Sequence, residues 1–191
     1  MNKKTIALEK EQYTKIIESI RNGFTFNGSE FKPNDRLATL LVVQANLGVR
    51  ISDILKLRLT DIIKESGRYR LDIVEQKTQK ARCFTIPTAL HDYLVAYADK
   101  NRINHQARLF HLCERAVQKQ LKIVCDFLGY SGISTHSFRK FYATSIYLDN
   151  DYDIELVRHL LQHSSASVTQ KYIGISSARV EKAIEKHVCL M

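Results

Sequence analysis

Apolar residues recur at spacings of three and four along most of this chain, and glycines follow several of the runs. Tyr13, Ile16, Ile17 and Ile20 would share one face of a helix, which Gly23 would end. Because an α-helix has 3.6 residues per turn, this spacing predicts a helix that buries one face in a core. The same pattern predicts further helices over residues 36–47, 52–57, 87–99, 117–128, 137–148, 154–161, 165–172 and 177–187.

The connection after the first helix contains Gly28 and Pro33, so residues 24–34 are predicted to form a loop. Asp35 is expected to cap the next helix, because a carboxylate there can accept from the N–H groups of the first turn. Gly48 is expected to end that helix, since glycine adopts the left-handed conformation of a helix end without strain.

Two segments in the middle of the chain alternate apolar and polar residues instead. Leu71 and Ile73 would face one side of a strand over residues 69–75, and residues 82–86 repeat the alternation. The polar residues 76–80 between them predict a hairpin turn. The expected fold class is therefore mainly α with a small antiparallel β-sheet (α+β).

The length of 191 residues suits one domain with one core, and no internal linker is visible, so residues 1–191 are expected to form a single domain. No apolar run approaches the roughly 20 residues that span a bilayer, and no signal peptide follows Met1. The cysteines form no CxxC pair, which is typical of reduced thiols in a cytoplasmic protein. They are Cys83, Cys113, Cys125 and Cys189.

The chain is strongly basic, with 29 Lys and Arg against 20 Asp and Glu and a formal net charge of +9. This balance favours a polyanionic partner, because each neutralised phosphate releases condensed counterions. Many small proteins are basic for other reasons, so charge alone does not establish nucleic-acid binding.

Several polar residues stand in contexts that are hard to explain as surface positions. Arg50 follows a helix-ending glycine and has apolar neighbours. His136 and Arg139 are three apart, on one face of a helix start. His163 interrupts an apolar stretch, and Tyr172 comes nine residues later.

Taken in order, these segments resemble the motifs of the tyrosine recombinase family, the phage integrases and their chromosomal and transposon relatives. Arg50 lies in a G-x-R-x-S-[DE]-x-L segment, and Lys77 lies in a Lys-Thr context within the predicted turn. His136 and Arg139 form H-x-x-R, His163 lies in Leu-Leu-x-His, and the tyrosine follows. Each match alone is weak, but six in order over nearly the whole chain are specific.

The resemblance implies the catalytic-domain fold of this family and a site-specific recombinase that cleaves and rejoins double-stranded DNA. Tyr172 would attack a phosphodiester to give a 3′-phosphotyrosyl intermediate. Arg50 and Arg139 would clamp the non-bridging oxygens, because a planar guanidinium matches two oxygens at once. Lys77 would protonate the 5′-oxygen as it leaves.

Of the two histidines, His136 would assist proton removal from the tyrosine or orient it, and His163 would donate to a non-bridging oxygen. The resemblance implies no metal, ATP or other cofactor. His159 and His163 are four apart on a helix, but no third ligand and no H-E-x-x-H pattern accompany them.

Each residue also has an ordinary structural interpretation. Arg50 could neutralise Asp53, Lys77 could be a solvated turn residue, and Lys80 lies in the same turn. His163 could cap a helix C-terminus, and one of nine tyrosines could simply pack in the core.

The chain departs from the family pattern at Lys140, where histidine is common, and at Gln162, where glycine is usual. Lys140 could add a phosphate contact. The first predicted helix begins within about ten residues of Met1, so an N-terminal core-binding domain, which completes a clamp around DNA in the family, is expected to be absent.

Two other functions stay open. One is a non-recombining DNA-binding accessory protein of the same fold, and the other is a type IB topoisomerase-like activity. The resemblance also implies self-assembly on DNA, from a dimer to a tetramer in the synapse, and no membrane partner. An apolar stripe in the last predicted helix would suit docking on a neighbouring protomer. It consists of Val180, Ala183, Ile184 and Val188.

Overall fold

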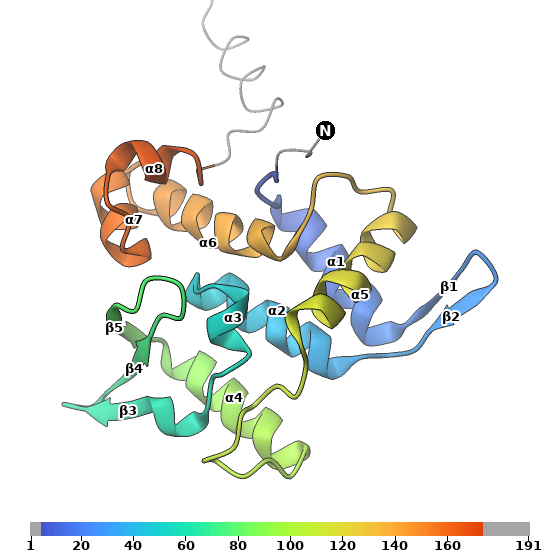
Figure 1. The fold of residues 1–191 in the computed structure, drawn as a ribbon, viewed down its shortest axis with the longest axis horizontal. Helices are drawn as coiled ribbons and strands as arrows, with labels where there is room; N and C mark the ends of the chain where they lie inside the picture. The colour runs from blue at the N-terminus through green and yellow to red at the C-terminus, as the bar shows by residue number, and fades with distance from the viewer. Residues whose placement is uncertain (1–4, 174–191) are drawn as a thin grey trace, which may run out of the picture.

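A computed structural model describes residues 5–173 of the chain. The predicted helix over residues 177–187, its apolar stripe and Cys189 lie outside the described residues. Figure 1 shows helices gathered around α2, with a small sheet at one end. The helices are α1 (Lys10–Asn22), α2 (Asp35–Leu47), α3 (Ile51–Ile54), α4 (Thr88–Lys100), α5 (Glu114–Phe127), α6 (Thr135–Asp149), α7 (Ile154–Leu161) and α8 (Ala166–Gln170). A 3-10 turn covers Leu59–Asp61.

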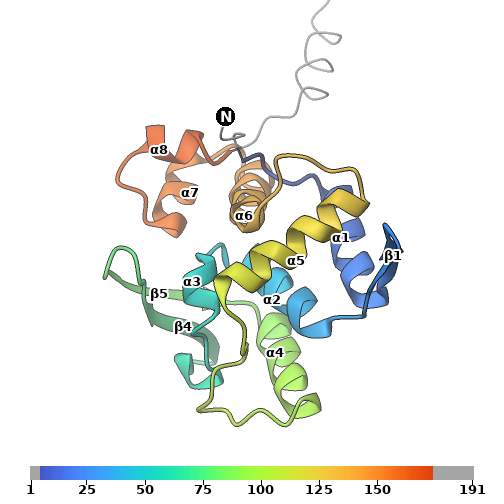
Figure 2. The same cartoon turned by 45° about the vertical axis from the view of Figure 1, so that its right-hand side comes forward.

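The expected fold class is confirmed, and α2 is the central element. It contacts α1, α3, α4 and α6, and most of its residues are buried, including Leu37, Leu40 and Leu41. Figure 2 shows α5 crossing over α2 while α4 lies below it. A helix that is apolar around most of its circumference is buried on most sides, as α2 is here. No helix within residues 5–173 is long and apolar enough to cross a bilayer.

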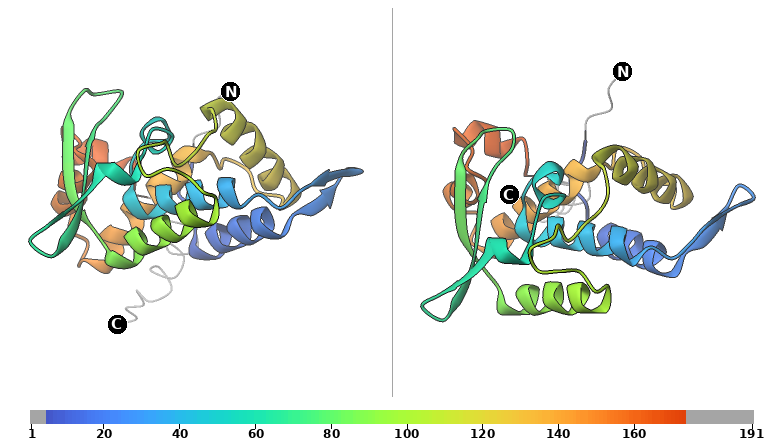
Figure 3. Two further views of the ribbon diagram at one scale, coloured as in Figure 1. Left: turned by 90° about the horizontal axis from the view of Figure 1, so that it is seen from below. Right: turned by 60° about the horizontal axis from the view of Figure 1, so that its bottom comes forward.

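The prediction of a loop over residues 24–34 is wrong, because this segment forms a hairpin. Strands β1 (Phe24–Phe26) and β2 (Ser29–Phe31) pair antiparallel. Asn27 and Gly28 connect them with positive φ angles of 48° and 72°. Asn-Gly is a strong two-residue hairpin signal, which the prediction overlooked. Figure 3 shows this hairpin projecting from one end of the molecule.

The cap of α2 also differs from the prediction. The side chain of Asn34 accepts a hydrogen bond of 3.0 Å from the N–H of Leu37. Asp35 is the first helical residue, and its carboxylate accepts from Lys100 instead. Both residue types can cap a helix, so the position at which the backbone turns decides which one does.

The predicted hairpin in the middle of the chain is confirmed, and it forms part of a three-stranded antiparallel sheet. Its strands are β3 (Ile62–Glu65), β4 (Arg68–Val74) and β5 (Ala81–Ile86), in that order. Leu71 pairs with Phe84 across the sheet, and both lie on the same face as Ile86 and Arg82. β3 was not predicted, because its two adjacent isoleucines are followed by charges and do not alternate.

The ends of two helices bring the C-terminal part of the chain against α2. Gly48 ends α2 with φ of 60°, and a Cβ atom there would lie 2.2 Å from the ring of Tyr142 on α6. Gln162 ends α7 in the same left-handed conformation, with φ of 52°. A small second core joins α6 and α7 through Ala143, Val157 and Leu161.

Candidate active site

Arg139 joins the C-terminal ends of α2 and α7. Its side chain is fully buried on α6, where Nη1 donates to the carbonyl oxygen of Gly48 at 2.7 Å and Nη2 donates to that of Leu161 at 3.1 Å. Carbonyls at a helix C-terminus are unpaired and carry partial negative charge, so a cation there is stabilised. Burial and the nearby charge of Arg50 lower the pKa of Arg139 to about 10, and the group stays protonated at neutral pH.

Arg82 is a second buried arginine between the same two helices, and the sequence interpretation missed it. Its Nη2 atom donates to the carbonyls of Leu160 at 2.7 Å and of Leu47 at 3.4 Å. Its guanidinium also lies 4.5 Å from the ring of Phe84. The sequence could have indicated this role, because Arg82 falls on the apolar face of a predicted strand. A charge buried there needs buried partners.

Arg50 precedes α3, at the point where the chain leaves Gly48. Its guanidinium donates to Glu75, whose side chain is buried, while the Arg50 side chain is 17% exposed. The alternative pairing of Arg50 with Asp53 is not observed. Asp53 instead accepts a hydrogen bond of 2.9 Å from the backbone N–H of Gln76 and so holds the base of the turn.

Glu75 directly follows β4 and was not singled out in the sequence analysis. Burial raises the pKa of its carboxyl, but hydrogen bonds from Arg50 and Thr78 and the charge of Arg82 outweigh burial. The pKa of Glu75 is therefore lower than usual, and the group is ionised at neutral pH. In the sequence, only its position two residues before Lys77 indicated that Glu75 could belong to the site.

The hydroxyl oxygen of Tyr172 lies 2.9 Å from Nε2 of His136. Tyr172 follows α8, and its backbone N–H donates to Thr169 at 2.8 Å. Burial lowers the pKa of His136, and the positive charges of Arg139 and its neighbours lower it further. The imidazole is therefore neutral at neutral pH and can accept a proton from the tyrosine.

His163 also lies beside Tyr172, with the two ring centres 4.5 Å apart. Its Nδ1 atom is 3.1 Å from the hydroxyl of Thr169. Burial and the charge of Arg139 lower the pKa of His163 to about 4. His163 is 8% exposed and neutral at neutral pH.

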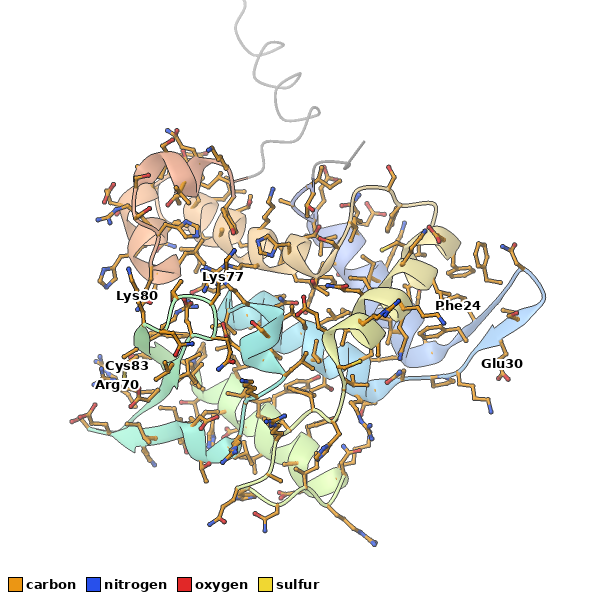
Figure 4. All side chains as sticks on the ribbon, viewed as in Figure 1. Phe24, Glu30, Arg70, Lys77, Lys80 and Cys83 are labelled. Atoms are coloured by element: carbon orange, nitrogen blue, oxygen red, sulfur yellow. The ribbon has the colours of Figure 1, made fainter. Side chains whose placement is uncertain are left out.

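Lys77 occupies the exposed turn between β4 and β5. Its charge is among those that lower the pKa of His136, so the turn lies within electrostatic reach of the Tyr172 pair. Figure 4 labels Lys77 on the side of the turn nearer α6 and Lys80 on the outer side. The carbonyl of Lys80 closes the turn by accepting from the N–H of Glu75 at 3.0 Å.

The structure thus gathers five of the six sequence-predicted residues near the ends of α2 and α7, and the turn that carries Lys77 lies within electrostatic reach of them. His159 is exposed while His163 is buried, so the two histidines do not face one site. Within residues 5–173 no group of three or more His, Cys, Asp or Glu side chains could hold a metal ion. Lys140 donates to the carbonyl of Thr5 at 2.6 Å, which ties the N-terminal segment to α6.

A family model described as "Phage integrase family" matches residues 7–179. The tyrosine recombinase XerA of Pyrococcus furiosus is 28% identical over 188 residues, which cover 94% of this chain and 61% of that protein. The chain thus spans about three fifths of the length of this relative.

Solved structures of recombinases and integrases share the fold. The XerH site-specific recombinase bound to palindromic difH substrate has a TM-score of 0.71 at 23% identity, over 96% of this chain and 53% of that one. The catalytic domain of bacteriophage HP1 integrase has a TM-score of 0.64 at 18% identity, over 96% of both chains.

Proposed function

The chain belongs to the phage integrase family, and on that basis we propose that it is a site-specific tyrosine recombinase acting on double-stranded DNA. The observation that carries the proposal is the pairing of the Tyr172 hydroxyl with a neutral histidine beside buried arginines. A nucleophile needs a base within hydrogen-bond reach, and His136 lies 2.9 Å away. The phosphate under attack needs fixed positive charge, which Arg50 and Arg139 supply.

In the proposed reaction, the oxygen of Tyr172 attacks the phosphorus of the scissile phosphodiester, and its proton passes to His136. The bond between phosphorus and the 5′-oxygen breaks, and Lys77 protonates that oxygen. The product is a 3′-phosphotyrosyl enzyme and a free 5′-hydroxyl. A 5′-hydroxyl of another strand reverses these steps, so rejoining needs no ATP.

The charge that builds on the non-bridging oxygens would be balanced by Arg50 and Arg139, with His163 donating a hydrogen bond to one oxygen. Two fixed guanidinium groups can balance this charge without a metal ion. We therefore propose that the reaction needs no divalent metal.

We also propose that the protein assembles on its DNA site as a dimer that pairs into a tetramer. Exchange of strands between two duplexes requires two cleavage sites on each, and each site needs its own nucleophile. The net charge of +9 supports binding of the DNA backbone.

The proposed function is tested by trapping the covalent intermediate. Duplexes selected from a random pool by binding to the protein are remade with a nick next to each candidate site. Loss of a short fragment then prevents rejoining. We expect a protein–DNA species on a denaturing gel with the wild type and none with Tyr172→Phe. Binding without this species would indicate an accessory protein, and relaxation of supercoiled plasmid lacking the site would indicate a topoisomerase.

A further inference from the structure

We propose that Glu75 is a positioning residue that holds the phosphate-binding Arg50 and the turn carrying Lys77 in one fixed arrangement. The inference rests on the proposed function, because it assigns a task to each of these two residues. Glu75 itself does not contact the DNA in this proposal. It acts through the groups that its carboxylate and backbone hold.

The carboxylate of Glu75 connects the two parts directly. Its Oε2 atom accepts hydrogen bonds from the guanidinium of Arg50 and, at 2.8 Å, from the hydroxyl of Thr78. Thr78 is the residue after Lys77. One buried oxygen atom therefore links Arg50 to Thr78, the neighbour of Lys77. A displacement of Arg50 would shift Thr78, and the reverse.

The backbone of Glu75 holds the same turn. Its N–H donates to the carbonyl of Lys80 at 3.0 Å, and its carbonyl accepts from the N–H of Gln79 at 2.8 Å. The turn is otherwise exposed at every residue from 76 to 80. Exposed turns lose their order easily unless buried groups hold them. Glu75 is therefore a buried anchor of this turn, together with Asp53, which accepts from the N–H of Gln76.

Charge explains why this anchor is a carboxylate. The charge of Arg50 acts on both Arg82 and Arg139, and the charge of Glu75 opposes it at both. Its second oxygen lies 3.4 Å from Nη1 of Arg82. Like charges without a counter-ion repel and would drive the half-buried Arg50 toward water. The ionised Glu75 keeps Arg50 in place.

The same geometry leaves Arg50 able to bind a phosphate. An arginine has five N–H donors, and in Arg50 the Nη1 atom donates to Glu75. This bond orients the remaining donors and leaves them able to bind a phosphate. Partners that orient metal ligands contribute about 10–100-fold to affinity or activity, and we expect an effect of the same order for a partner that orients Arg50.

The test compares Glu75→Gln with wild type on two DNA substrates. Glutamine keeps the size of the side chain and removes its charge. One substrate is ordinary DNA, and the other carries sulfur in place of the bridging 5′-oxygen at the cleavage site. A thiolate leaves without a proton donor, so this substrate removes the need for the general acid. Single-turnover formation of the covalent complex is measured on each.

We expect Glu75→Gln to be about 10–100-fold slower on ordinary DNA. On the sulfur substrate the rate of Glu75→Gln should lie closer to that of wild type but remain below it. This substrate no longer needs the proton from Lys77, but it still needs phosphate binding by Arg50. Lys77→Ala should recover to nearly the wild-type rate on that substrate. Equal rates for wild type and Glu75→Gln on ordinary DNA would overturn the proposal. An undiminished deficit on the sulfur substrate would overturn the link to Lys77.

Glu65→Gln is the matched control, because Glu65 also pairs with an arginine of this sheet, Arg70, but at an exposed position. It should match wild type on both substrates. If Glu75→Gln fails to fold, as judged by thermal melting, Thr78→Val removes only the hydrogen bond to the turn. The rate of covalent complex formation by Thr78→Val should be a few-fold below wild type on ordinary DNA and equal to wild type on the sulfur substrate. An unchanged rate on ordinary DNA would contradict the proposal. A wild type that forms no covalent complex on either substrate would refute the proposed function instead.

Discussion

The side chains of His136 and Tyr172 are 36 residues apart in the chain and share a hydrogen bond of 2.9 Å. His136 lies in the first turn of α6, and Tyr172 follows α8. The small core between α6 and α7 fixes this distance, because Tyr172 packs against it. The hydroxyl and the imidazole are therefore aligned before any substrate binds.

His136→Ala should reduce the single-turnover rate of covalent complex formation by about 10²–10⁴-fold, since a base positioned for proton transfer contributes on that scale. DNA affinity should change little, because the histidine is neutral. A rate within twofold of wild type would exclude His136 as the base. Lowering the pH should slow wild-type cleavage as the ring becomes protonated, at a pH below the ordinary histidine value because the pKa of His136 is lowered.

Arg139→Lys should abolish detectable cleavage and also lower the free energy of unfolding by about 2–3 kcal/mol. A lysine cannot reach the carbonyls of Gly48 and Leu161 together, and hydrogen bonds from a charged group contribute about 1.5–3 kcal/mol each. Urea unfolding gives the stability, and the covalent-complex assay gives the activity. Normal stability with lost cleavage would contradict the structural part of this role, and normal cleavage would contradict the phosphate-binding part.

The free energy of unfolding should fall as the pH is lowered from about 7 to 5. The pKa of His163 is about 4 in the folded protein and near 6.5 when unfolded. Below pH 6.5 the unfolded chain takes up a proton that the folded chain does not, so acid favours unfolding. The loss from this group is on the order of 2 kcal/mol by pH 5. His163→Gln should show a smaller decrease, and an identical pH dependence would refute the assignment.

Gln162→Gly should be more stable than Gln162→Ala by about 1 kcal/mol. Both substitutions remove the hydrogen bond of 3.1 Å from the Gln162 amide to the carbonyl of Ala81. Only glycine adopts the φ of 52° without the strain that a Cβ atom causes. Urea unfolding of the two variants measures the difference directly. Equal stabilities would show that this helix end carries no backbone strain.

The sequence alone predicted most of the helices within residues 5–173, the central hairpin and six residues of the candidate site, but neither Glu75 nor Arg82. Helix and strand periods are local properties, so the spacing of Ile16, Ile17 and Ile20 or the alternation around Leu71 is enough to predict them. The left-handed end of α2 at Gly48 follows from local chemistry too. The N-terminal hairpin could also have been predicted, since Asn27 and Gly28 carry its signal.

Only the tertiary structure decided the partners of the charged residues. Arg50 has one acid three residues away, Asp53, and another 25 residues away, Glu75, and it pairs with the distant one. Arg139 donates to carbonyls 91 and 22 residues away. A local pattern cannot select among such partners, because the choice depends on which groups are buried together when the helices pack. The desolvation of these charges, which sets their pairing and the pKa values of the two histidines, exists only once the core has formed.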